Sequence, residues 1–73
     1  MKKSIYSKQH AYTVEQLKKA REEAGLEQAR VAKTLGRTQS YVSKIESGQR
    51  RIDLVQLNYF AKIYKKPLDY FIP

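Results

Sequence analysis

The stretch LGRTQSYVSKIESG, Leu35–Gly48, has the glycine spacing and the polar content that decide the fold of this chain. Two glycines bracket a segment of helical length, and glycine readily adopts the positive φ that ends a helix. Thr38 is a good N-cap, so the stretch predicts a helix that starts after Thr38 and stops at the second glycine. Only Val42 and Ile45 give this helix a clearly apolar side.

The other side of this predicted helix, residues 39–47, is rich in polar side chains. Serine lowers helix propensity, so several serines on one face of a short helix favour a role beyond solvation. Glutamine pairs bidentately with adenine, lysine donates to guanine, and serine serves as either partner at a base edge. The face therefore predicts a surface that reads the major groove of DNA, made of Gln39, Ser40, Ser43 and Lys44. A plain solvent-exposed face is the alternative at this point.

The segment before this stretch predicts a first helix over residues 14–24. Thr13 would cap it, with Gln16 as partner in a capping box, and apolar residues then recur every three to four positions until the first glycine. Residues 1–12 lack this periodicity and carry several cations. We therefore expect a flexible basic arm over 1–12, followed by one domain over 13–73.

A second helix is predicted over residues 28–35, ending at Gly36. Its N-cap position holds Glu27, which caps poorly although its charge suits the helix dipole. Only a short glycine-containing turn then leads to Thr38. This connection is typical of a helix-turn-helix pair.

The remainder of the chain predicts two more helices. Asp53 and Gln56 form a capping box for a fourth helix, whose apolar stripe runs to Tyr64. Pro67 then forces a break before a last short helix in LDYFI. No segment has the alternating pattern of a strand. The sequence thus predicts an all-α domain of five helices.

The charge of the chain indicates a polyanionic partner. Lys and Arg number 15 against 7 Asp and Glu, a formal net charge of +8 in 73 residues. Arg37 precedes the polar helix and Arg50 and Arg51 follow it, so phosphate contacts are expected from these cations and from Gln28 at the start of the second helix. Ordinary solubility is the alternative for each of them, and a ribosomal protein would share the overall charge.

Other classes of function lack the residues that they need. The chain has no cysteine and one histidine, His10, so neither disulfides nor a Cys/His metal site is expected, and no cofactor. No apolar run is long enough to cross a membrane and no leader segment is recognisable, which predicts a cytoplasmic protein. The clustered serines have no histidine nearby and no aromatic platform for single-stranded RNA is evident, so neither an enzyme nor an RNA-binding protein is expected.

The run Leu17–Phe71 resembles the Cro and phage-repressor (XRE-type, lambda-repressor-like) helix-turn-helix family of prokaryotes and phages. The resemblance rests on GLEQ leading to VAKTLG and then to TQSYVSKIESG. It implies a compact lambda-repressor-like domain that regulates transcription by binding double-stranded DNA in the nucleoid, with the helix over 39–47 in the major groove. With the cations above, the residues implied in DNA contact are Gln28, Arg37, Thr38, Gln39, Ser40, Tyr41, Ser43, Lys44, Arg50 and Arg51. The resemblance also implies a structural ion pair between Arg21 and Glu46.

Several positions depart from the pattern of the family. Glu27 replaces a Ser or Thr cap, and Ile52 replaces a common proline. Lys65 stands where a glycine often closes the fourth helix, and Arg37 replaces an apolar residue in the turn. Arg37 is therefore either a lost contact with the core or a gained contact with phosphate.

Members of this family usually bind two half-sites as a two-fold dimer, so we expect a homodimeric repressor of a palindromic operator. The apolar end of the chain is the candidate dimer surface, through Leu68, Tyr70, Phe71 and Ile72, with capping of the core as the alternative. The second hypothesis is an antitoxin, which would bind a toxin and repress its own promoter through the same helix. The sequence does not separate the two, because the DNA-binding face would be identical.

Overall fold

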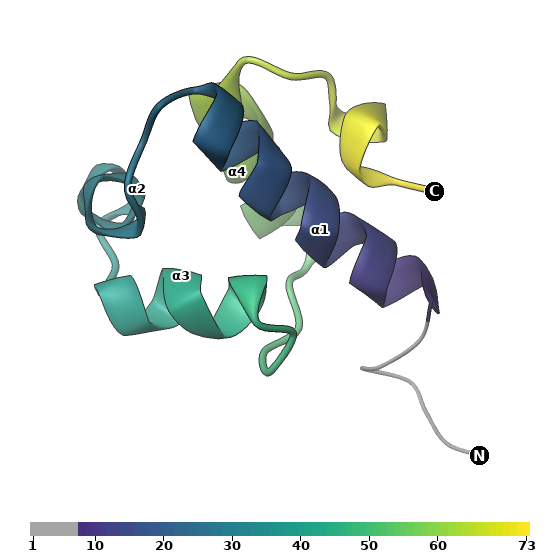
Figure 1. Ribbon diagram of the computed structural model, residues 1–73, viewed down its shortest axis with the longest axis horizontal. Helices are drawn as coiled ribbons and strands as arrows, with labels where there is room; N and C mark the ends of the chain where they lie inside the picture. The colour runs from purple at the N-terminus through teal and green to yellow at the C-terminus, as the bar shows by residue number, and fades with distance from the viewer. Residues whose placement is uncertain (1–7) are drawn as a thin grey trace.

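The computed structural model describes residues 8–73, and this part of the chain is all-α (Figure 1). The elements follow in the order α1 (Lys8–Glu23), α2 (Gln28–Leu35), α3 (Gln39–Glu46), α4 (Leu54–Tyr64) and the 3-10 turn η1 (Leu68–Phe71). The predicted class and the order of the elements are confirmed. Four α-helices and one 3-10 turn replace the five helices that the sequence predicted.

The first helix is longer than its sequence pattern indicates. α1 begins at Lys8, so residues 8–12 are helical and do not belong to a flexible arm. The remainder of that predicted arm, residues 1–7, lies outside the described residues. Thr13 is inside α1 and is not its cap. Its hydroxyl donates a hydrogen bond of 2.7 Å to the backbone carbonyl of Phe71, which joins α1 to the C-terminal turn.

The core forms where the helices meet around α1. Its fully covered side chains come from α1, α2, α3, α4 and η1, and the largest of them are Leu17, Val31, Val42, Ile45, Phe60 and Phe71. Burial of this apolar surface is the main driving force for folding. α2 packs chiefly on α3, whereas α1 contacts α3, α4 and η1. α3 is therefore supported from two sides, and Figure 1 shows it crossing below α1 next to α2.

The starts of the inner helices follow their local chemistry. The side chain of Thr38 accepts a hydrogen bond of 3.2 Å from the backbone N–H of Tyr41. Asp53 accepts one of 2.8 Å from the backbone N–H of Gln56. Both predicted N-caps are thus confirmed. Glu27 forms no side-chain capping bond at the start of α2, as its residue type predicted.

The ends of the helices use left-handed residues. Gly36 and Gly48 have φ of 71° and 82°, which glycine adopts without steric cost. α4 instead ends on Lys65, with φ of 58°, where the family favours glycine. A residue with a Cβ in this region carries a strain of about 1 kcal/mol. Lysine in place of glycine at position 65 therefore still ends α4, but it lowers the stability of the fold.

The C-terminal turn belongs to the core of its own chain. The backbone N–H of Tyr70 donates to the carbonyl of Pro67 at 3.0 Å, an i to i+3 bond, so this segment is one 3-10 turn and not a fifth helix. Phe71 has no exposed surface, and Leu68 and Tyr70 pack against the core. Phe71 is therefore unavailable as a dimer contact. Leu68 and Tyr70 are half-buried, and Ile72 is the one exposed residue of the four candidates.

None of the helices within residues 8–73 has the length and apolar character required to cross a membrane.

Candidate nucleic-acid interface

The inner side of α3 fixes this helix in the core. Val42 and Ile45 are fully buried, and Tyr41 is only 8% exposed. Tyr41 was expected among the DNA contacts, yet its ring packs inward, because residues four apart on a helix share a face and Tyr41 stands four before Ile45. That spacing is a sequence signal for its burial.

The outer side of α3 carries the four predicted reading residues, Gln39, Ser40, Ser43 and Lys44, and all four are exposed. Their side chains form no hydrogen bond within the described part of the chain. Thr38, at the edge of this face, has its hydroxyl oxygen occupied by the cap of α3. The structure thus presents amide, hydroxyl and ammonium groups on a helix whose opposite side is anchored.

A partly buried ion pair sets the position of the end of α3. Arg21 in α1 donates to Glu46 through Nε at 2.7 Å and through Nη2 at 3.1 Å. The Nη1 group of Arg21 donates to the carbonyl of Leu26 at 2.8 Å, so the guanidinium also holds the turn before α2. The hydrogen bond with Glu46 raises the pKa of Arg21. The pair implied by the family resemblance therefore links α1, the following turn and α3.

Gln28 joins the same network. Its side-chain Nε2 donates to Oε1 of Glu46 at 3.0 Å, which ties the start of α2 to the end of α3. Gln28 was expected to offer this amide to a DNA phosphate. In the structure Glu46 engages an N–H of this amide.

Two arginines meet at the ring of Tyr41. The guanidinium carbon of Arg37 lies 4.6 Å from the ring centroid, and that of Arg50 lies 4.9 Å from it. Burial raises the pKa of Tyr41, while the two nearby cations oppose this shift. Arg37 comes from the turn before α3 and Arg50 from the loop after it. The structure therefore brings together two cations that are separated by the whole of α3 in the sequence.

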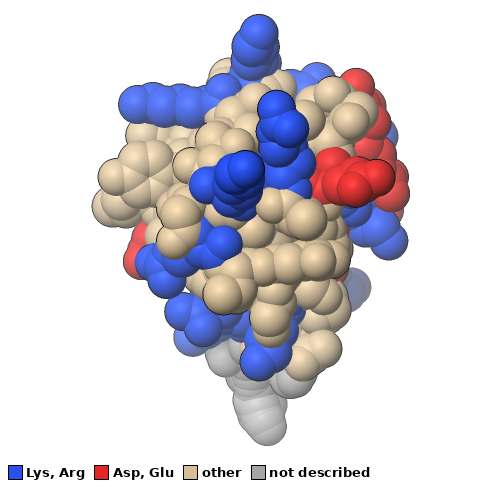
Figure 2. Space-filling model, turned by 90° about the vertical axis from the view of Figure 1, so that its left-hand side faces the viewer, with Lys and Arg blue, Asp and Glu red and all other residues tan. Residues whose placement is uncertain are grey.

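The face of the molecule that carries α2 and the start of α3 is rich in basic side chains. Figure 2 shows Lys and Arg spread across this face, with Asp and Glu toward its edges. Arg51, the third predicted cation, is exposed in the loop after α3. A basic surface of this kind attracts the phosphate backbone of DNA without regard to sequence.

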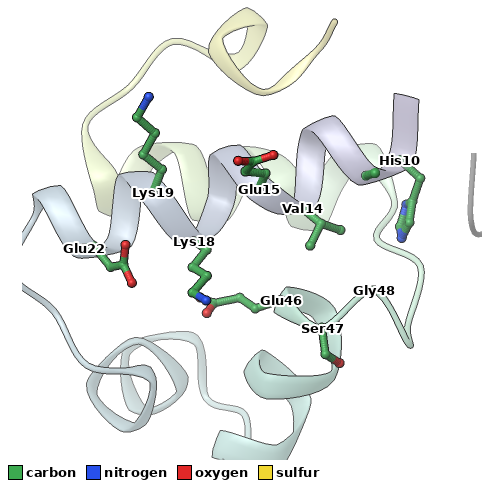
Figure 3. Close-up of a pocket in the computed structure, with 10 residues that line it drawn as sticks. His10, Val14, Glu15, Lys18, Lys19, Glu22, Glu46, Ser47 and Gly48 are labelled. Carbon is green, nitrogen blue, oxygen red and sulfur yellow. The ribbon is translucent and has the colours of Figure 1, made fainter. Parts of the chain in front are cut away.

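A separate groove of about 700 Å³ lies between α1 and the end of α3 (Figure 3). His10, Val14 and Lys18 line it from α1, and Ser47 and Gly48 line it from the end of α3. Among the described residues, no group of three His, Cys, Asp or Glu side chains is placed to hold a metal ion. None of the residues that line this groove is Arg37, Tyr41 or Arg50.

Comparisons with known proteins agree with this geometry. A family model described as a helix-turn-helix domain matches residues 14–69. Among solved structures, the chain is similar to the restriction-modification controller protein C.AhdI from Aeromonas hydrophila, with 28% sequence identity and a TM-score of 0.76. That match covers 90% of this chain and 100% of the other. No curated protein matches the sequence at a significant level.

Proposed function

Because this chain belongs to the helix-turn-helix family of DNA-binding transcription regulators, we propose that it recognises a specific sequence in double-stranded DNA with α3 in the major groove. The observation that carries the proposal is the contrast between the two sides of α3. One side supplies fully buried Val42 and Ile45, and the other leaves four polar side chains exposed. A helix anchored in this way keeps its outer side chains in a fixed position for base edges.

The outer side chains suit distinct roles at the groove. Gln39, in the first turn of α3, has an amide that can pair with adenine. Ser43 stands four residues later on the same face, and its hydroxyl accepts or donates at a base edge. Lys44 suits guanine or an adjacent phosphate. The exposed Arg51 and the backbone N–H groups at the start of α2 contribute phosphate contacts that fix the register.

We further propose that the chain acts as a homodimeric repressor on a palindromic operator. One domain of this size contacts few base pairs, and two copies gain affinity by binding two half-sites about 34 Å apart. Exposed apolar side chains are available for such contact on α4, where Leu54, Val55 and Tyr59 are 62%, 63% and 54% exposed. Ile72, at 46% exposure, is the one member of the predicted C-terminal surface that joins them as an exposed large apolar residue.

The likeness to a restriction-modification controller protein favours a role as a regulator of that kind over an antitoxin. An antitoxin would need a surface for a toxin in addition to α3. The two functions differ in partner and not in the DNA face. A genetic test therefore asks which neighbouring reading frame is derepressed when this gene is deleted: a restriction or modification enzyme supports the controller, and a toxin supports the alternative.

Selection of bound duplexes from a random pool tests the proposal directly. We expect an enriched palindrome whose two half-sites are about one helical turn apart. Gln39→Ala and Ser43→Ala should change the enriched bases, whereas Lys62→Ala, an exposed change on α4, should return the wild-type motif. Enrichment of no common sequence would contradict specific recognition, and a single asymmetric site would contradict the homodimer.

A further inference from the structure

The arrangement of Arg37, Tyr41 and Arg50 carries an inference beyond general DNA binding. Both guanidinium groups lie within 5 Å of the Tyr41 ring centroid, at 4.6 and 4.9 Å. The face of an aromatic ring attracts cations, and the attraction is greatest where water is partly excluded. Tyr41 is nearly buried, so its ring is a fixed support on which the two arginines rest.

The backbone fixes the base of each arginine as well. The N–H of Arg37 donates to the carbonyl of Ala32 at 2.8 Å, immediately after the left-handed Gly36. The N–H of Arg50 donates to the carbonyl of Lys44 at 3.2 Å, so the loop after α3 folds back along the helix. The backbone of each arginine is therefore held by a hydrogen bond, and both guanidinium groups contact the same ring.

A pocket of about 540 Å³ opens beside this ring. Three cations line it, Arg37, Lys44 and Arg50, and no carboxylate does. Thr38 and Ser40 add hydroxyl groups. Within residues 8–73 neither arginine forms an ion pair. The carboxylate of Asp53 acts electrostatically on Tyr41 but does not line the pocket. An anion placed between them would offset their repulsion and accept hydrogen bonds from both.

We propose that this pocket binds one phosphodiester group of the DNA backbone, and that Tyr41 is a positioning residue that holds Arg37 and Arg50 in place for it. The proposal rests on the proposed DNA binding. DNA is the source of the phosphate because Ser40 and Lys44 belong both to the pocket and to the outer face of α3. Arg37 is then a gained phosphate contact, which answers the question raised by its replacement of an apolar residue in the turn.

The first test measures the salt dependence of binding to a duplex of arbitrary sequence, which needs no operator. Neutralising one phosphate contributes about 0.9 to the slope of log affinity against log salt. If Arg37 and Arg50 share one phosphate, the Arg37→Ala/Arg50→Ala double variant should lose about one unit of slope in total. Two independent contacts would lose about two units, and that result would overturn the shared pocket.

The second test separates positioning by Tyr41 from simple core packing. Tyr41→Phe keeps the ring and should keep the wild-type affinity, whereas Tyr41→Leu should weaken binding about three- to tenfold. In the Arg37→Ala/Arg50→Ala background, Tyr41→Leu should cause no further loss. An equal loss in both backgrounds would show a structural role only. Thermal unfolding of each variant checks that the fold persists, and Tyr41→Phe and the arginine variants stay informative if Tyr41→Leu unfolds.

The third test locates the phosphate. In a selected duplex, single phosphates are replaced in turn by neutral methylphosphonates. Wild-type protein should lose affinity at one position in each half-site where the double arginine variant loses nothing. A uniform loss at all positions for both proteins would overturn the proposal. If no specific duplex is found, the proposed operator fails while the slope measurement still decides the pocket.

Discussion

Glu46, the last residue of α3, accepts two hydrogen bonds from Arg21 of α1, at 2.7 and 3.1 Å. The side chain of Glu46 is 4% exposed and that of Arg21 is 13% exposed, so neither charge is well solvated. Removing one partner of such a pair leaves the other charge uncompensated. The orientation of α3 therefore depends on a polar contact as well as on apolar packing.

Glu46→Ala should lower the free energy of unfolding by about 3 kcal/mol, because Arg21 and Gln28 both lose their acceptor. Urea-induced unfolding measures this loss. Glu23→Ala is the matched control, since Glu23 pairs with Lys66 at 3.1 Å on the surface and should cost less than about 1 kcal/mol. Losses of equal size for the two variants would contradict a structural role for the partly buried pair of Arg21 and Glu46.

Thr13→Val should cost about 1 kcal/mol, because the new side chain cannot donate to the carbonyl of Phe71. Thr13→Ser keeps the hydroxyl and should retain most of the stability. Thermal unfolding of the two variants side by side gives the comparison. If the valine variant is as stable as the serine variant, the 2.7 Å hydrogen bond does not hold the C-terminal turn.

Tyr64→Phe should leave stability at neutral pH unchanged or slightly higher, since the hydroxyl of Tyr64 is buried without a hydrogen-bond partner among the described residues. Burial, with a further contribution from Glu46, raises the pKa of Tyr64. The folded chain thus holds this proton when the unfolded chain has released it.

This linkage makes the wild type lose stability as the pH rises above about 10, the pKa of an unfolded tyrosine. The Tyr64→Phe variant should lose less over the same range, and unfolding measured from neutral to alkaline pH tests it. Tyr59→Phe removes an exposed phenol and serves as the control. An alkaline loss as steep in Tyr64→Phe as in the wild type would contradict this role for Tyr64.

Gln39→Ala should weaken binding to the selected operator by about 1 to 3 kcal/mol and relax the preference at one base pair. Fluorescence anisotropy on duplexes mutated at each position measures both effects. Ser47→Ala is a suitable comparison, because the hydroxyl of Ser47 donates to the carbonyl of Lys44. This hydrogen bond indicates that Ser47 stabilises the end of α3 locally. An equal loss on every duplex would assign Gln39 to the backbone.

Lys65→Gly should raise the free energy of unfolding by about 1 kcal/mol, because glycine removes the strain of a Cβ at φ of 58°. Lys65→Ala removes the charge and keeps the Cβ, so it should give no such gain. Urea-induced unfolding again provides the measurement. A gain with alanine as large as with glycine would assign the effect to charge.

The parts of the fold that could be predicted were those fixed by local chemistry. Thr38, Asp53, Gly36 and Gly48 lie at helix ends in the sequence and in the structure. The start of α1 could not be predicted in the same way. The hydroxyl of Thr13 is used by Phe71, a contact between residues far apart in the chain, and the local pattern does not contain it.

In the candidate site, too, the features set by local sequence could be predicted and those set by tertiary packing could not. Helical periodicity predicted which side chains of α3 face outward, and these side chains are exposed as expected: Gln39, Ser40, Ser43 and Lys44. The engagement of Gln28 by Glu46 and the meeting of two arginines over Tyr41 depend on how α2, α3 and the following loop pack. The burial of Tyr41 could have been predicted from its four-residue spacing to Ile45. Its contacts with two arginines could not.

The side chains of Gln39 and Ser43 are exposed and form no hydrogen bond within the described residues, which has a consequence for the divergence of such regulators. Substitutions at these two positions remove nothing that the fold depends on, since the anchoring groups of α3 lie on its opposite side and at its last residue. With Gln39 and Ser43 at base edges, as proposed, target preference can change one base pair at a time with little change in stability. Duplicated copies of this domain in one genome could acquire separate operators by a few substitutions, each intermediate remaining folded.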